Sequence, residues 1–354
     1  MLPAKYYQYI YLLIITVITY FICNYSSKHR GKENLFPSLL LCLLLILVIG
    51  YRPIDRAFAD TMSYAENWQF FYKEPFEFNF NAENLLFDNL FAYIGSLGLN
   101  ISVFFVIISA IYFGSILIAC RKLFPNNTLL AFVVYLGALS TFSYGTNGIK
   151  AGAAASLFLL ALAYYDKLYL SIILVLLSWG FHHSMQLPFA AYIITLFFKN
   201  QKIYFAIWFI CLLISAAHIT FFQTLFAGLT DESGAKYLTS DEFGTVKGFR
   251  LDFIIYSAMP ILMGYYVKYK YHFSGKFYET ILNIYILSNS IWMLSMYAAF
   301  TNRIAYLSWF MYPFLIIYPS LRIKDQKHPL VVNRNKFIGL HLGFTLFMFF
   351  IYYI

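Results

Sequence analysis

Long apolar runs separated by short polar breaks dominate the pattern of hydrophobic and polar positions along this chain. A helix of about 20 apolar residues crosses the hydrocarbon layer of a membrane, and backbone groups in lipid must hydrogen-bond within their own segment. No run alternates polar and apolar residues as a half-buried strand would. The pattern therefore predicts about twelve transmembrane helices, near residues 6–23, 35–51, 99–119, 127–143, 147–165, 168–181, 184–198, 203–222, 251–267, 277–298, 304–320 and 337–354.

The composition leads to the same class of protein. Of the 354 residues, 61% are hydrophobic, 21% are aromatic and only 12% are charged, which is too few charged residues to cover the surface of a soluble domain. No internal repeat or long linker divides the chain. We therefore expect an all-α, polytopic integral membrane protein that forms a single transmembrane domain over residues 1–354. Its first segment should stay as an anchor, because the basic cluster follows it rather than precedes it.

The basic residues indicate how the chain is oriented. Sixteen of the 25 Lys and Arg residues occupy every second loop, which marks those loops as cytoplasmic. The same alternation explains the net charge of +9 without a nucleic-acid partner. The outer face then carries two longer loops, near 52–98 and 223–250, and the first of them contains an amphipathic stretch with Leu86, Leu90, Phe91 and Ile94 on one helical side. The four cysteines lie in or beside the spans with no paired spacing, which indicates neither a disulfide framework nor a zinc site. We expect no other metal and no cofactor.

Positive charges on the outer side run against the orientation rule, so each of them needs a separate reason to be there. Arg52, Arg56, Asp60 and Tyr64 lie just beyond the second apolar segment. Arg56 has an equally good explanation as a solvated loop residue. Arg52 and Asp60 are the stronger candidates for a site.

Three further positions add polar groups on the same side. Lys150 follows Asn147 near the start of a helix built from small residues, and His182 and His183 lie at the turn between two short apolar segments. Arg303 begins the eleventh segment with no acidic residue near it in sequence. Lys150 and Arg303 have an alternative role as residues that snorkel to the lipid headgroups, and the histidines an alternative role as structural turn residues. As a group, however, the cations suit a diphosphate, whereas Asp60 or a histidine suits the activation of a hydroxyl.

The order of these residues resembles the EpsG family of polysaccharide polymerases, part of the wider Wzy group. The elements that carry the resemblance are Arg52, Asp60-Thr61 and Tyr64; Glu83 with Leu86-Phe87; Asn147, Lys150 and Ala151; Phe181, His182 or His183, and Ser184; and Arg303 with Tyr306. Two positions depart from the family pattern. Phe58 stands where the family usually has Gly, and Lys150 stands where it usually has Arg, which keeps the charge but loses the bidentate geometry.

The resemblance implies a GT-C-like fold and a metal-independent, inverting glycosyl transfer between undecaprenyl-diphosphate-linked oligosaccharides. The reaction would take place on the outer face of the bacterial cytoplasmic membrane. Arg303, Arg52 and Lys150 would neutralise the leaving diphosphate, and Asp60, His182 or His183 would accept the hydroxyl proton. Arg56, Tyr64, Asn147 and Tyr306 would bind substrate. The product would be an O-antigen of lipopolysaccharide, a capsule or a secreted polysaccharide, made with a chain-length regulator as partner.

Two other functions use similar residues. A flippase for lipid-linked oligosaccharides would bind the same diphosphate without a base, but it predicts internal repeats and charges at mid-membrane, which the sequence lacks. A membrane O-acyltransferase that modifies sugars would have a similar size. Its histidine should lie on the acyl-donor side of the membrane, whereas His182 and His183 are expected on the outer side. The resemblance, together with these two differences, favours the polymerase.

Overall fold

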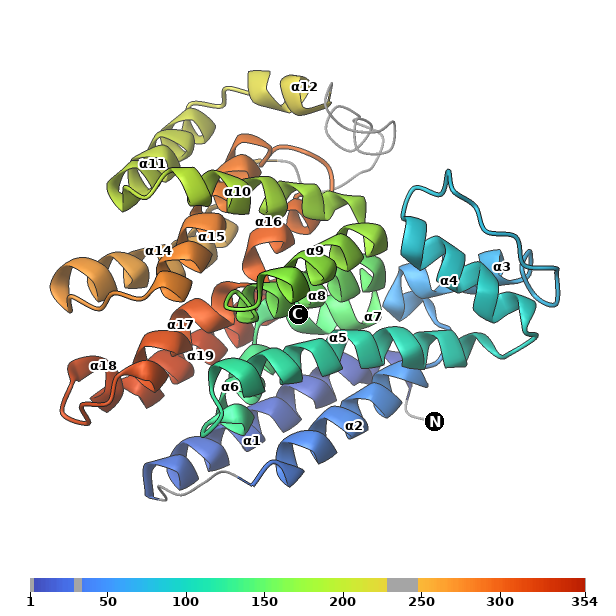
Figure 1. Ribbon diagram of the computed structural model, residues 1–354, viewed down its shortest axis with the longest axis horizontal. Helices are drawn as coiled ribbons and strands as arrows, with labels where there is room; N and C mark the ends of the chain where they lie inside the picture. The colour runs from blue at the N-terminus through green and yellow to red at the C-terminus, as the bar shows by residue number, and fades with distance from the viewer. Residues whose placement is uncertain (1–2, 29–33, 228–247, 354) are drawn as a thin grey trace. The chain divides into compact units, whose positions relative to one another are not determined.

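The computed structural model describes residues 3–28, 34–227 and 248–353, and these residues form helices and connecting loops without a strand (Figure 1). By backbone packing the chain divides into two compact units. The first unit comprises Met1–Gln186 and Ile317–Ile354, and the second comprises Leu187–Ile316. The expected all-α class is confirmed for the described residues.

The first unit holds the helices of the N-terminal half of the chain and the last two helices. Its elements are η1 (Ala4–Tyr6), α1 (Tyr7–Lys28), α2 (Phe36–Gly50), η2 (Arg56–Phe58), α3 (Asp60–Trp68), α4 (Leu85–Ser96), α5 (Ile101–Leu123), α6 (Thr128–Leu136), α7 (Leu139–Thr146), α8 (Ile149–Ala163), α9 (Leu168–Phe181), η3 (His183–Met185), α18 (Pro329–Val332) and α19 (Arg334–Tyr353).

The second unit holds most of the remaining helices. Its elements are α10 (Gln186–Phe197), which begins at the unit boundary, α11 (Gln201–Ala216), α12 (Phe221–Ala227), α14 (Leu251–Tyr265), a short π-helix (Tyr266–Lys270), α15 (Lys276–Leu294) and α16 (Thr301–Trp309). The chain returns to the first unit within α17 (Tyr312–Arg322).

Most predicted apolar segments coincide with one helix whose ends differ by a few residues, but fewer helices are long enough to cross a membrane unaided. Among the described residues three helical stretches have the necessary length and hydropathy: Ala4–Asn24, Ile101–Leu123 and Thr301–Arg322. A fourth is the pair α6 and α7, which bends by 78° at its break. Several other apolar helices are shorter, such as α2 and α9. The number of twelve spans therefore stays a prediction.

The break between α6 and α7 falls inside the predicted segment 127–143 and is supported by side chains. The carbonyl oxygens of three consecutive residues at the break, Val134 to Leu136, each accept a hydrogen bond from a side chain. The Tyr11 hydroxyl donates to Leu136 O at 2.7 Å, and the Thr141 hydroxyl donates to Tyr135 O at 2.8 Å. The His341 Nε2 lies 3.0 Å from Val134 O, so this nitrogen carries the proton. Because buried carbonyls need partners, these contacts stabilise a bend that hydropathy alone does not reveal.

Removal of one of these donors should destabilise the first unit. The Tyr11→Phe change keeps the ring and deletes the hydroxyl, so the Leu136 carbonyl is left buried without that donor. We expect a loss of about 1–3 kcal/mol, visible as a lower Tm in detergent. The matched control is Tyr20→Phe, because Tyr20 is 67% exposed. An equal Tm for the two variants would contradict this account of the break.

The core of the first unit is built around α8, which packs against α5 and α9. Every residue from Gly152 to Ala163 on α8 is buried. Gly152 permits the closest approach, since a Cβ atom there would lie 2.5 Å from the carbonyl oxygen of Tyr144 on α7. The small residues of this helix therefore fix its N-terminal end, which carries Lys150, against the preceding helix.

Candidate functional site

The polar side chains of the first unit gather where α3, α4 and α8 begin and where η3 follows α9. We call Asp60, Glu83, Asp88, Lys150, His182 and His183 the polar cluster. Packing of α4 against α3, α5 and α9 brings these helix ends together.

Arg52 forms the buried support beneath α3. Its side chain is only 2% exposed. Its Nη1 donates to Ile49 O at 2.9 Å, its Nε donates to the Thr61 hydroxyl at 3.3 Å, and the guanidinium lies 4.3 Å from the centre of the Phe105 ring. Burial lowers the pKa of the Arg52 guanidinium to about 10, so the group stays charged at neutral pH. Arg52 therefore joins the end of α2 to the first turn of α3.

Asp60 begins α3 and is held in place by its backbone. Its amide donates to Asn147 Oδ1 at 3.1 Å, and the neighbouring Thr61 hydroxyl contacts Thr146 O at 3.4 Å. The preceding residue, Ala59, has a φ of 37°, which is uncommon for a residue other than glycine. Asn147, expected to bind substrate, thus holds the start of α3, and the half-buried Asp60 side chain is fixed at this turn.

Lys150 lies three residues after Asn147, in the first turn of α8. Its Nζ donates to Asp88 Oδ1 at 2.8 Å and lies 5.0 Å from the centre of the Phe87 ring. Both members of the pair are partly exposed, at 28% for Lys150 and 31% for Asp88. The ammonium is therefore accessible, and it has a carboxylate partner that an anionic ligand would have to displace.

His183 is attached to the same end of α4 as Lys150. Its backbone amide donates to Asn84 Oδ1 at 3.2 Å, and its Nδ1 lies 3.4 Å from Glu83 Oε1. Asn84 also donates its own amide to Asp88 Oδ2 at 3.0 Å. One short segment before α4 thus positions both the histidine and the carboxylate that holds the lysine.

His182 makes a different contact from its neighbour. Its Nδ1 accepts a hydrogen bond from the Ser184 amide at 3.1 Å and so caps η3. The two imidazole rings lie 4.9 Å apart between centres. Because Nδ1 of His182 is an acceptor, the proton of the neutral ring lies on Nε2. The two histidines are therefore chemically distinct, which the sequence does not reveal.

The other predicted residues are half-buried or exposed. The Tyr64 ring packs 6.0 Å from Phe87 and 6.1 Å from Phe91, measured between centres. Arg56 is exposed at the start of η2. Arg303 and Tyr306 belong to α16 of the second unit. The Arg303 side chain is exposed, and its guanidinium lies 5.0 Å from the centre of the Phe300 ring. The Tyr306 ring lies 5.5 Å from that of Trp309 between centres. Within the first unit, the structure links Arg52 and Asn147 to the start of α3, and Lys150 and His183 to the start of α4.

Three members of this arrangement were not expected as site residues: Glu83, Asn84 and Asp88. A signal for them exists in the sequence, because Asn84 and Asp88 are four residues apart at the start of a helix and closely follow Glu83. That spacing allows a carboxylate to accept from the helix N-terminus. What the sequence lacks is the long-range pairing of this segment with Lys150 and His183.

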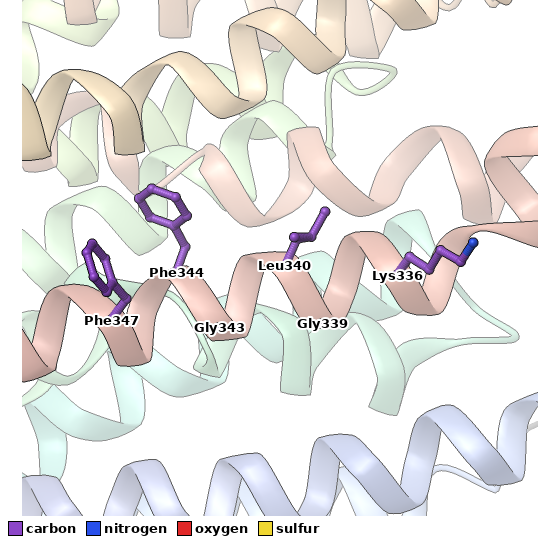
Figure 2. A pocket seen from close by; sticks show the side chains of 6 residues that line it. All are labelled: Lys336, Gly339, Leu340, Gly343, Phe344 and Phe347. Carbon is purple, nitrogen blue, oxygen red and sulfur yellow. The ribbon is translucent and has the colours of Figure 1, made fainter.

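A depression of about 750 Å³ runs along α19, lined by Lys336, Gly339, Leu340, Gly343, Phe344 and Phe347 (Figure 2). Its lining is almost wholly apolar and contains no predicted site residue, so its chemistry does not suit a reacting centre. The loop near 223–250, expected on the outer face, lies largely outside the described residues. No group of three or more potential ligands for a metal occurs among the residues that the structure describes.

Comparison with known proteins gives one result. The EpsG family model matches residues 35–354, which includes every residue of the polar cluster. No curated protein and no solved structure shows significant similarity to the chain. With its apolar helices, the chain is a membrane protein related to polysaccharide biosynthesis. A match of this extent shows that the chain belongs to the EpsG family.

Proposed function

We propose that this protein is a polymerase that joins undecaprenyl-diphosphate-linked oligosaccharide repeat units by inverting glycosyl transfer on the outer face of the bacterial cytoplasmic membrane. One observation carries the proposal. A histidine beside a carboxylate, His183 with Glu83, shares the start of α4 with an accessible lysine, Lys150. This arrangement supplies a base and a cation in a chain of the EpsG family.

The reaction requires one bond to form and one to break. A sugar hydroxyl of the incoming unit attacks the anomeric carbon of the growing chain from the side opposite the diphosphate. The bond between that carbon and the diphosphate oxygen breaks, and the electron pair leaves with undecaprenyl diphosphate. The hydroxyl proton passes to a base, and a cation stabilises the charge that develops on the leaving group.

We assign the base role to His183. Its Nδ1 faces the Glu83 carboxylate, and a carboxylate there favours the tautomer with the proton on Nδ1. The lone pair then lies on Nε2, where it can accept the hydroxyl proton. His182 has the opposite tautomer, because its Nδ1 already accepts from Ser184, and its Nε2–H is a donor to substrate. Asp60 is assigned to the binding of acceptor-sugar hydroxyls.

Lys150 is assigned to the leaving diphosphate. Asp88 holds the ammonium in the absence of substrate, and a diphosphate carries more negative charge than one carboxylate. Arg303, which is exposed on α16, is proposed to bind an anion in the second unit. Arg52 is less suited to direct contact, because it is 2% exposed and bonded beneath α3. Its assigned role is to position α3.

Glu83→Gln should lower kcat with little change in KM, because it removes the charge that orients His183 and no group that binds the sugar. We expect a loss of about 10- to 100-fold, part of the 100- to 10,000-fold that a positioned base contributes. Glu77→Gln is the matched control, since Glu77 is exposed on the loop before α4. Equal kcat values for the two variants would argue against Glu83 as the orienting residue.

The alternatives predict different products from the same assay. Purified protein in proteoliposomes is supplied with one defined undecaprenyl-diphosphate repeat unit, and the glycans are separated by size. A polymerase gives a ladder of repeat multiples, a flippase moves the substrate across the bilayer without lengthening it, and an O-acyltransferase changes its mass only with an acyl donor. A reconstituted protein that flips or acylates the unit but makes no ladder would refute the proposal.

A further inference from the structure

The loop between α3 and α4 exposes an unusual number of aromatic side chains. It follows Trp68 and contains Phe70, Phe71, Tyr72, Phe76, Phe78 and Phe80, of which Phe70 is 74% and Phe80 is 82% exposed. Figure 1 shows this loop, with α3 and α4, at the edge of the first unit. Apolar exposure along α1 or α2 is explained by lipid around a span, but this loop lies outside the apolar helices.

The loop is held in a defined conformation. The side chain of Asn89, which is 6% exposed, donates to the carbonyls of Asn79 and Leu85, and its Oδ1 accepts from the Asn79 amide at 2.7 Å. At the other end of the loop the Lys73 amide donates to Gly95 O at 3.1 Å. The aromatic side chains are therefore presented by a fixed backbone.

The length of α5 indicates how deep the loop would lie in a membrane. Arg121 and Lys122 end the 23-residue helix α5, and about 20 residues before them cover the roughly 30 Å of a hydrocarbon core. That distance ends at Ile101. The exposed Leu97 and Leu99, and Gly95 to which the loop is bonded, therefore lie just beyond the hydrocarbon boundary.

The amphipathic side expected for residues 86–94 does not provide this exposed surface. Phe87, Phe91 and Ile94 of α4 are buried within the protein. The Phe91 ring contacts Trp68 at 4.8 Å and Phe104 at 5.0 Å between centres. The apolar surface that faces outward comes instead from the loop before α4 and from Tyr93, which is 46% exposed.

We infer that the loop of residues 70–80 is a membrane-interface anchor that inserts its phenylalanines among the lipid headgroups beside α5. Its composition fits lipid better than a glycan, because phenylalanine has no polar group to hydrogen-bond a sugar hydroxyl. Lys73, Glu74 and Glu77 interrupt the aromatic series, as expected for a segment that lies in the interface rather than the hydrocarbon. The anchor holds α4 at the membrane surface, and with it Asp88 of the polar cluster.

Spin labelling tests the depth of the loop independently of any enzymatic activity. Cys42, Cys120 and Cys211 are buried, so a protein with Cys23→Ser and a single Phe80→Cys accepts a nitroxide at one accessible site. In nanodiscs of phosphatidylethanolamine and phosphatidylglycerol, we expect the label at 80 to be relaxed more by dissolved oxygen than by a water-soluble nickel complex. Phe70→Cys should behave in the same way.

The matched control is Glu77→Cys, on the same loop. Its label should be more accessible to the nickel complex than the label at Phe80. Equal, water-like accessibility at positions 70, 77 and 80 would overturn the inference. Because the measurement needs no turnover, it separates a failed anchor from a failed polymerase.

Discussion

Replacement of His183 by glutamine should lower the rate of polymerisation by about 100- to 10,000-fold, the range that a positioned general base contributes. The change keeps a polar side chain of similar size but removes the basic Nε2. Its backbone contact with Asn84 does not depend on the side chain, so the fold of η3 should persist. The measurement is the initial rate of ladder formation with a defined lipid-linked repeat unit.

Two further histidine variants make this result specific. His272→Gln is a matched control in a loop of the second unit, where the side chain is exposed, and should keep the wild-type rate. His182→Asn retains an acceptor that can cap Ser184 while it removes the Nε2 donor, so its loss should be smaller than that of His183→Gln. If His182→Asn abolished activity while His183→Gln retained it, the assignment of the two histidines would be reversed.

Replacement of Lys150 by methionine should have the second large effect. A cation that stabilises developing charge on the leaving group contributes about 100- to 1,000-fold to kcat, and methionine keeps the apolar stem without the charge. Lys150→Arg should recover most of the rate, because the EpsG pattern usually has arginine at this position. The measurement is kcat for both variants.

The ion pair with Asp88 requires a separate control for Lys150. Loss of the lysine leaves Asp88 without its 2.8 Å partner, so the Tm of Lys150→Met must be compared with that of the wild type. Asp88→Asn breaks the same ion pair but keeps the ammonium. If Asp88→Asn lowered kcat as much as Lys150→Met, the role of Lys150 would be structural rather than catalytic.

Hydropathy predicts the helices of this chain well but not where they break. The runs at 35–51 and 168–181 coincide with α2 and α9, because continuous apolar composition is sufficient to define a helix in lipid. The run at 127–143 looks equally continuous, yet it bends by 78° between α6 and α7. Two of the three donors that stabilise this bend, Tyr11 and His341, come from near the opposite ends of the chain, so a local pattern cannot indicate them.

Several residues of the candidate site can be predicted from the sequence, but the contacts between them cannot. Unexplained charges drew attention to Asp60, Lys150 and the two histidines, which the structure places on one set of helix ends. Glu83 entered the prediction only as part of the family resemblance, and Asp88 was not singled out, because their partners are 100 and 62 positions away in sequence. Arg52 was expected to meet substrate, and only its burial under α3 indicates a supporting role.

The central claim is that this EpsG-family chain forms a glycosidic bond with undecaprenyl diphosphate as the leaving group. The most direct measurement is mass spectrometry of both products after purified protein in nanodiscs is incubated with one defined lipid-linked repeat unit. We predict one undecaprenyl diphosphate released for each repeat added to the glycan, and neither product from a His183→Gln, Lys150→Met double variant that folds as the wild type does. Release of undecaprenyl diphosphate without glycan growth, or equal growth with the double variant, would contradict the account.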